Sequence, residues 1–277
     1  MHISVKKNLK KDKSALAGLV MLSLLVLIAL AAPLFTKDPR AFSNLILSKP
    51  DINHILGTND LGQDIFSRLF YGLRTSIFIS IAAGALSTFL SVIIGIFSGL
   101  TGGIIDQIIM RIIDAMLVIP SIIILILISA FIKPDLIGLI ILISIFHWQG
   151  GARIIRGQTL SLKQKGHIYS ATTFGAKKAY ILARHIIPDL GNIITASFLH
   201  NARSAVFLEA GIAFIGISAA DTISLGTMMN RALEFYYLPV WAWWLLPAGI
   251  MLSLILISLT LLNNLIEKII DPRLHDA

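Results

Sequence analysis

The chain has 277 residues, of which 56% are apolar and only 14% are charged. This composition excludes a soluble globular domain and predicts an integral membrane protein that is all-α and polytopic. The formal net charge of +8 comes without a basic face interleaved with aromatic residues, so we expect no nucleic-acid partner. The chain contains no cysteine, which excludes a disulfide framework and a thiolate metal site.

Apolar runs of about 20 residues, enough to cross a bilayer, recur along the chain. The first run follows a lysine-rich tail, residues 1–14, and is too long for the core of a signal peptide, so we expect an uncleaved helix. The fourth run is short, and a span that extends through Gly150 and Gly151 is the alternative. The six expected membrane spans are Ala15–Phe35, Ser76–Leu100, Ile112–Ile132, Leu136–Trp148, Ile193–Ile217 and Trp241–Ile266.

The distribution of Lys and Arg predicts the orientation of these spans. Both residue types are more numerous in the N-terminal tail, in segment 153–190 and near the C-terminus than in the loops on the other side. We therefore expect segment 36–75 outside the cell, and segment 153–190 and the tail 267–277 in the cytoplasm. The spans from 76 to 266 would form the core of a multi-pass protein of a bacterial cytoplasmic membrane.

Residues 167–190, "HIYSATTFGAKKAYILARHIIPDL", are polar in an otherwise apolar chain. Gly175 separates two helical patterns and admits the positive φ that a turn between helices needs. Pro188 either ends the second helix or begins the next span. Ile168, Ala171 and Phe174 give the first helix one apolar edge. We expect a helix–turn–helix that lies on the membrane face with one side free to dock.

Several separated motifs resemble one family. The spacing from Ser170 and Ala171 through Gly175 to Pro188 is similar to the EAA loop of ABC importer membrane subunits. The other motifs resemble the smaller membrane subunit of the dipeptide, oligopeptide and nickel branch: "HILGTNDLGQDIFSRLFYGLRTS" (54–76), "ARIIRGQTLSL" (152–162), "FLEAGIAFIGI" (207–217) and "DPRL" (271–274). The resemblance implies the ABC type I importer permease fold from about residue 15 to the end.

The resemblance also implies which residues couple this subunit to an ATPase. In the family the short helix of this loop sits in a groove of a separate ATPase subunit, and small side chains permit the close approach. The alternative is an ordinary polar loop. The residues assigned to coupling are Tyr169, Ser170, Ala171, Phe174, Gly175, Ala176, His185 and Pro188.

The chain departs from the family pattern at four positions. Tyr169 stands where the family has the Glu of its motif, so the resemblance does not imply that glutamate's contact with the ATPase for this chain. Asn59 and Gln63 replace an Asp and an Arg, and Leu225 replaces a Trp.

The implied partners supply what the chain lacks. None of its glycines is followed by Lys, so it has no P-loop, and it has no hydrolase motif either. We expect no enzymatic activity and no cofactor in this chain, with ATP and Mg²⁺ bound by two ATPase subunits. A homologous permease forming a heterodimer, an extracytoplasmic solute-binding protein and membrane lipid complete the expected partners.

Ionisable residues inside the spans are candidates for the translocation pathway. Arg203, Glu209 and His200 are assigned to it, although each of the two charged residues could instead face a neighbouring helix. Arg111 and Asp114, at i and i+3, can form a local pair. His147 and His200 lack the spacing of metal ligands, so hydrogen bonding within the bundle is favoured and no metal site is assigned.

Two further patterns concern packing. Small residues recur every fourth position in the second span, which predicts a groove for another helix of this bundle or of a partner. Aromatic residues before and within the last span are typical of interfacial anchors, with a substrate platform as the alternative. The groove consists of Ala83, Ser87, Ser91, Gly95 and Gly99; the aromatic cluster consists of Phe235, Tyr236, Tyr237, Trp241, Trp243 and Trp244.

The predicted function is a permease subunit of an ABC importer, with dipeptides or oligopeptides as the favoured solutes. Nickel or a metal chelate is the alternative solute. An ion-coupled secondary transporter and a membrane scaffold are the rival classes. The first would carry inward-facing carboxylates and inverted repeats, whereas Asp114 and Glu209 are nearly alone in the spans and no repeat is obvious. The second would not need the ordered set of motifs.

Overall fold

A computed structural model describes residues 12–218 and 222–270. In these ranges the chain is helical apart from its loops, and a single β-bridge joins Thr58 to Asp64. The helices are α2 (Lys13–Phe35), α3 (Ile65–Thr101), α4 (Gly103–Val118), α5 (Ser121–Ile132), α6 (Leu136–Ile145), α7 (Gln149–Lys163), α8 (Gly166–Thr173), α9 (Lys178–Ile181), a π-helix (Leu182–Ile186), α10 (Ile187–Asp189), α11 (Gly191–Phe214), α12 (Leu225–Leu233) and α13 (Trp241–Ile270).

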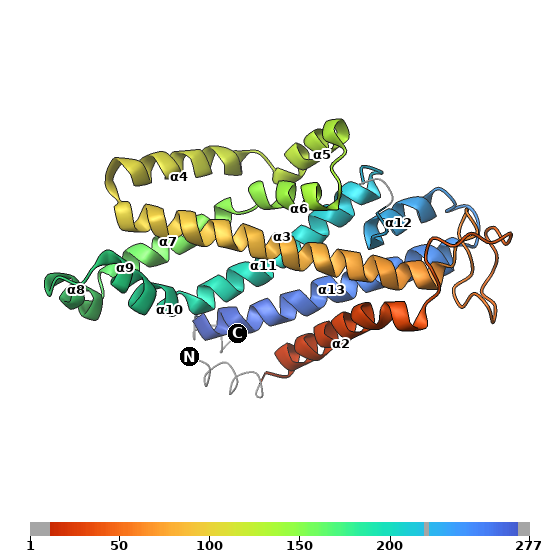
Figure 1. Ribbon diagram of the computed structural model, residues 1–277, viewed down its shortest axis with the longest axis horizontal. Helices are drawn as coiled ribbons and strands as arrows, with labels where there is room; N and C mark the ends of the chain where they lie inside the picture. Colours follow the sequence, from red (N-terminus) through yellow and green to blue (C-terminus); the bar gives the residue numbers. More distant parts are fainter. Residues whose placement is uncertain (1–11, 219–221, 271–277) are drawn as a thin grey trace.

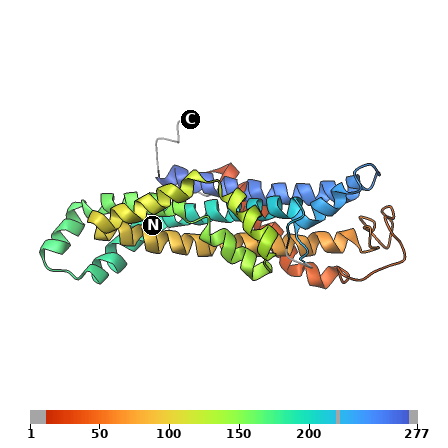
Figure 2. The same cartoon turned by 90° about the horizontal axis from the view of Figure 1, so that it is seen from above.

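The molecule is an elongated bundle in which α2, α3, α11 and α13 run side by side (Figure 1). Segment 36–64 and α12 lie at one end, and α8 lies at the opposite end in both views (Figure 2). We call these the 36–64 end and the α8 end. The two polar segments are therefore separated by the full length of the apolar bundle.

Three helices, α2, α3 and α13, are long and apolar enough to cross a membrane, and two bent helix pairs raise the number to five. The α4–α5 pair bends by 76° and the α6–α7 pair by 45°. The expected third span, Ile112–Ile132, is therefore two helices that meet at Ile119–Pro120. Proline lacks an N–H and pushes the preceding residue out of the α region, and Ile119 has an extended backbone.

Other boundaries also differ from the expected ones. α3 begins at Ile65 and not at Ser76, because Asp64 caps it by accepting hydrogen bonds from the backbone N–H and the hydroxyl of Ser67 at 2.8 and 2.6 Å. The start of the expected loop 153–190 belongs to α7. α11 ends at Phe214, and α13 continues to Ile270.

The small residues of α3 pack inside this chain's own bundle, which confirms one of the two alternatives for the groove. A Cβ atom added to Gly95 would lie 2.6 Å from the carbonyl oxygen of Ala152, and one added to Gly99 would lie 2.8 Å from the Cβ of Thr159. Ser91 donates a hydrogen bond to the carbonyl oxygen of Trp148 at 2.7 Å. These contacts bring α3 and α7 together along their length.

The aromatic cluster is divided. Tyr236 and Tyr237 are exposed, as anchors would be, but Trp244 is 1% exposed and belongs to the core between α3, α12 and α13. Its ring stacks on Phe235 with centroids 6.1 Å apart. Trp244 is thus a core residue, because one face of α13 turns it toward the bundle.

In segment 36–64, two of the departures from the family pattern form a pair. Asn59 donates from its side-chain amide to Oε1 of Gln63 at 2.9 Å, and both residues are buried. A neutral amide pair therefore occupies the two positions at which the family resemblance implied opposite charges. Leu225, the third departure, is buried at the first turn of α12.

Candidate functional site: a docking segment and a polar cavity

Residues 164–190 form the helix–turn–helix at the α8 end. Gly175 has a φ of +82°, and the N–H of Ala176 bonds to the carbonyl oxygen of Ala171 at 3.0 Å. This six-to-one bond around a left-handed glycine is the Schellman ending of a helix. The glycine turn predicted from the sequence is confirmed.

Apolar side chains anchor this segment to the bundle. Ile168, Ile186 and Leu190 are buried against Ile96 of α3 and Ile155 of α7. Lys165 and Asp189 also form an ion pair at 3.6 Å, which joins the start of the segment to its end. The segment is thus held on the bundle from both of its ends.

The tip of the segment is uncovered. Phe174 is 90% exposed, and a Cβ atom on Gly175 would meet no atom within 4 Å. The expected apolar edge is therefore split, because Ile168 turns into the bundle, Ala171 is half-buried and Phe174 points away. A large aromatic side chain left uncovered at the end of a helix is the kind of residue that is enriched at protein interfaces.

Pro188 does not end the second helix. The preceding π-helix lets the N–H of Ile187 bond to the carbonyl oxygen of Leu182, five residues back, and the helical bonds continue from Leu190 to Ile186 and from Ile194 to Leu190. A π-turn accommodates the proline because it re-pairs the backbone groups that the missing N–H would leave. The chain therefore passes from α9 to α11 without a loop.

The other assigned residues of this segment lie as follows. Ser170 is exposed, Ala176 packs partly into the anchoring cluster, and the His185 ring lies edge-on to Tyr180 with centroids 5.8 Å apart. Tyr169 belongs to α8, and its side chain lies outside the described part of the structure.

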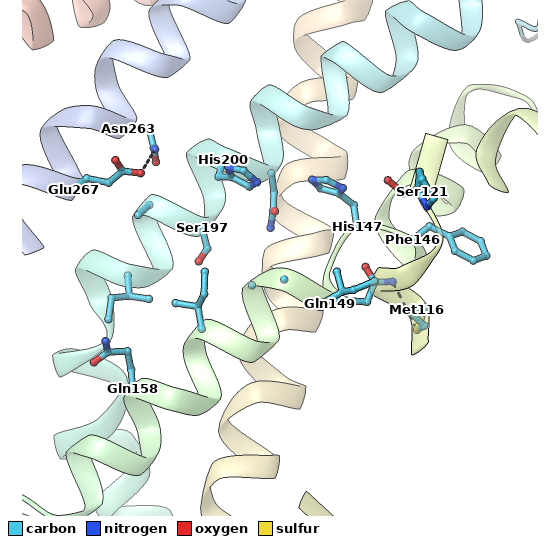
Figure 3. A pocket seen from close by; sticks show the side chains of 18 of the residues that line it. Met116, Ser121, Phe146, His147, Gln149, Gln158, Ser197, His200, Asn263 and Glu267 are labelled. Atoms are coloured by element: carbon cyan, nitrogen blue, oxygen red, sulfur yellow. Dashed lines mark hydrogen bonds between the residues drawn. The ribbon is translucent and has the colours of Figure 1, made fainter. Parts of the chain in front are cut away.

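A cavity of about 580 Å³ opens between the two bent helix pairs, α11 and the last turns of α13 (Figure 3). Its wall is mixed, with apolar side chains between amide, hydroxyl and imidazole groups. Among the described residues that line it, Glu267 carries the only full charge. The polar lining residues are Ser121, His147, Gln149, Gln158, Ser197, His200, Asn201, Asn263 and Glu267.

Of the three residues assigned to the pathway, only His200 lines this cavity. Arg203 lines a neighbouring cavity of about 360 Å³, which shares His147 with the first. Glu209 is 2% exposed and lines neither cavity. Its face of α11 turns into the bundle, and its pathway role stays a prediction.

His147 and His200, which are far apart in the sequence, face each other across the cavity. Their rings are nearly parallel, with centroids 6.1 Å apart. Residue spacing alone does not predict this contact, because it depends on the bend between α6 and α7. In the described part of the chain no three His, Cys, Asp or Glu residues gather as metal ligands would.

The expected pair of Arg111 and Asp114 is replaced by pairs between helices. Asp114 accepts a hydrogen bond from Arg153 of α7, and Asp106 accepts from Arg156 of the same helix, with Nε 3.0 Å from Oδ1. Ser98 of α3 also donates to Asp106. These pairs form because α4 lies alongside α7, which offers each aspartate a guanidinium from another helix.

These features together define a membrane-embedded helical bundle with a polar cavity and an exposed helix–turn–helix at one end. Comparison with known proteins agrees. The family model described as "Binding-protein-dependent transport system inner membrane component" matches residues 91–276, and "N-terminal TM domain of oligopeptide transport permease C" matches residues 4–50.

Relatives align over nearly the whole chain. The oligopeptide transport system permease protein OppC of Bacillus subtilis is 34% identical over 96% of this chain and 88% of its own length. The dipeptide transport system permease protein DppC of the same organism is 31% identical over 97% and 85%, respectively. OppC of Mycobacterium tuberculosis is 30% identical over 97% and 93%.

The chain belongs to the family of binding-protein-dependent transport system inner membrane components. It is therefore a permease subunit of an ABC importer with the type I permease fold, and it works with ATPase and substrate-binding partners.

Proposed function

We propose that this subunit forms one half of the membrane channel of a peptide importer. The half-channel would pair with a homologous permease, and two ATPases and an external peptide-binding protein would complete the complex. The relatives named as oligopeptide and dipeptide permeases support the choice of solute. The cavity supports it as well, because its amide and hydroxyl groups can bond to a peptide backbone.

In this proposal α11 is a sixth span in addition to the three straight helices and the two bent pairs. α11 runs beside α3 and α13 (Figure 1), and its polar residues turn toward the bundle and the cavities. The α8 end faces the cytoplasm, and segment 36–64 faces outward. The bias of Lys and Arg toward segment 153–190 supports this orientation.

The ATPases drive transport through the helix–turn–helix at 164–190. Phe174 inserts into a groove of the ATPase, and the small side chains beside it allow a close approach. ATP binding closes the ATPases and moves the segment, and the cavity then changes the side to which it opens. The exposed Phe174 beside the left-handed Gly175, on a segment otherwise anchored by buried isoleucines, is the observation that carries this role.

Single cysteines test the docking and the orientation, since the chain has no cysteine of its own. Phe174→Cys is compared with Tyr236→Cys, a residue that is 70% exposed on the loop before α13. We expect Phe174→Cys to crosslink to the ATPase subunit and to resist membrane-impermeant maleimide in intact cells. Tyr236→Cys should be labelled by the maleimide and should not crosslink to the ATPase. Labelling of Phe174→Cys from outside would overturn the proposal.

A second experiment tests the solute. The assembled transporter with its binding protein, reconstituted in liposomes, should take up radiolabelled di- and oligopeptides when ATP is supplied. Uptake of nickel or a metal chelate without uptake of peptides would favour the alternative solute.

A further inference from the structure

Arg203 is a cation in the middle of α11 with neutral partners only. Its guanidinium donates to Oγ1 of Thr260 at 3.3 Å and to Nδ1 of His200 at 3.4 Å. No carboxylate lies within ion-pair distance of it in the described part of the chain. Charged groups inside a membrane bundle are costly, so one kept without a counter-charge points to a transient anionic partner.

Glu267 is the opposite case on the neighbouring helix. Its Oε1 accepts a hydrogen bond from the side-chain amide of Asn263 at 2.6 Å, and no described cation pairs with it. The adjacent Lys268 is occupied by Asp12 at 2.9 Å. Asn263 is 6% exposed, and its Oδ1 is buried without a hydrogen-bond partner. Glu267 therefore presents a carboxylate to the cavity, and the buried Oδ1 of Asn263 is a second hydrogen-bond acceptor beside it.

The two charges line adjoining cavities, Glu267 the larger and Arg203 the smaller, and the two cavities share His147. Thr260, which holds the Arg203 guanidinium, and Glu267 are seven residues apart on α13, which puts them on the same helix face and about 10 Å apart along its axis. Figure 3 shows Asn263 and Glu267 across from Ser197 and His200 of α11. An extended tripeptide spans about 10 Å between its ends.

We propose that Arg203 and Glu267 form a two-point subsite for the ends of a zwitterionic peptide. Glu267 accepts hydrogen bonds from the α-ammonium group, and Arg203 donates to the α-carboxylate, with His200 holding the guanidinium in place. A short peptide that spans the two adjoining cavities then lies along α13 with its N-terminus toward the α8 end. This inference rests on the proposed import of peptides.

Binding of trialanine to the assembled permease–ATPase complex in nanodiscs, without the external binding protein, tests this subsite. We compare trialanine with its N-acetyl and C-amide forms. The unmodified complex should bind trialanine about tenfold more tightly than either blocked form, as expected for one charge-assisted bond lost at each end. Glu267→Gln should abolish the discrimination against the N-acetyl form only, and Arg203→Gln that against the C-amide form only.

Matched variants separate binding from structure. Glu267→Asp and Arg203→Lys keep the charges and should keep most of the discrimination, while Glu234→Gln and Arg74→Gln, exposed residues that line neither cavity, should change nothing. Equal binding of all three peptides by the unmodified complex would overturn the subsite. The same loss for free and blocked peptides in both glutamine variants would also overturn it.

The subsite and the proposed function fail in different ways. If the reconstituted transporter imports peptides but its permease does not distinguish the blocked forms, only the subsite is wrong. If no peptide is imported, the proposed function itself is wrong.

Discussion

Gly84 of α3 lies directly against Ala202 of α11, where a Cβ atom added to the glycine would be 2.7 Å from the Ala202 Cα. Ser80, one turn away, donates to the carbonyl oxygen of Ala202 at 2.9 Å. We expect Gly84→Ala to separate these helices and to lower stability by about 1–3 kcal/mol, as overpacking does. Thermal unfolding of the purified subunit in detergent should show a midpoint lower by several degrees.

Gly249→Ala is the matched control, because a Cβ atom at this position of α13 meets nothing within 4 Å. Alanine favours a helix over glycine, so this variant should be as stable as the parent or more stable. Equal effects of the two variants would show that Gly84 is not a close-packing position.

Gly175 gives a prediction about coupling. Its φ of +82° is strained for any residue with a side chain, although the space around it is open. We expect Gly175→Asp, or deletion of residues 169–176, to abolish peptide uptake while ATP hydrolysis and membrane insertion persist. The rates of peptide uptake and of ATP hydrolysis are measured in the same liposomes.

Gly166→Asp controls for the added side chain and charge. This glycine also has open space around it but has no left-handed φ. It should retain far more uptake than Gly175→Asp. Wild-type transport by the Gly175 variant would remove the turn from the mechanism.

The ion pair of Asp106 and Arg156 joins α4 to α7. Asp106 is 6% exposed, so Arg156→Met would leave a buried carboxylate without its cation, and we expect a loss of about 1–3 kcal/mol of stability. The double variant Asp106→Leu with Arg156→Met should be more stable than Arg156→Met alone. A double-mutant cycle on thermal unfolding measures the coupling, and a coupling near zero would contradict this assignment.

Asp12 links the first helix to the last, because it caps α2 and pairs with Lys268 of α13 at 2.9 Å. The hydrogen bond from Ser14, followed by that from Lys268, holds the pKa of Asp12 well below its usual 3.8. The folded state therefore binds this proton less readily than the unfolded state. Its stabilisation is complete above that usual pKa and is lost as the pH falls below it.

The measurement compares the unfolding midpoint of the parent and of Asp12→Asn at pH 7 and at pH 3. The parent should be more stable than the variant at pH 7, and the difference should shrink at pH 3. A difference that does not change with pH would mean that the Asp12 carboxylate does not act through its charge.

The positions of the apolar helices and of the glycine turn could be predicted from the sequence, because both depend on local patterns. Pro120 is a local signal for the bend, since proline interrupts a helix. The apolar run continues on both sides of it, however, so run length alone predicts one unbroken span. The π-turn before Pro188 and the early start of α3 at Ile65, directly after its cap Asp64, depend on hydrogen bonds that the lengths of apolar runs do not reveal.

Contacts between helices that are far apart in the sequence could not be predicted from it. His147 meets His200, and Asp114 meets Arg153, only because the bent α6–α7 pair returns along α3 and α4. The two cavities follow from the same bends. A single sequence places Arg203 and Glu267 on helices, but it does not show that they line adjoining cavities.

The helical bonds that continue from α9 through the π-turn into α11 have a mechanical consequence. A displacement of the segment at the α8 end is passed to the α11 wall of the cavity, because no loop between them can absorb the movement. The opposite walls, in contrast, contain non-helical joints at 119–120 and 146–148. Each transport cycle should therefore move α11 as a stiff rod, while the two jointed walls change their angles to admit and release the solute.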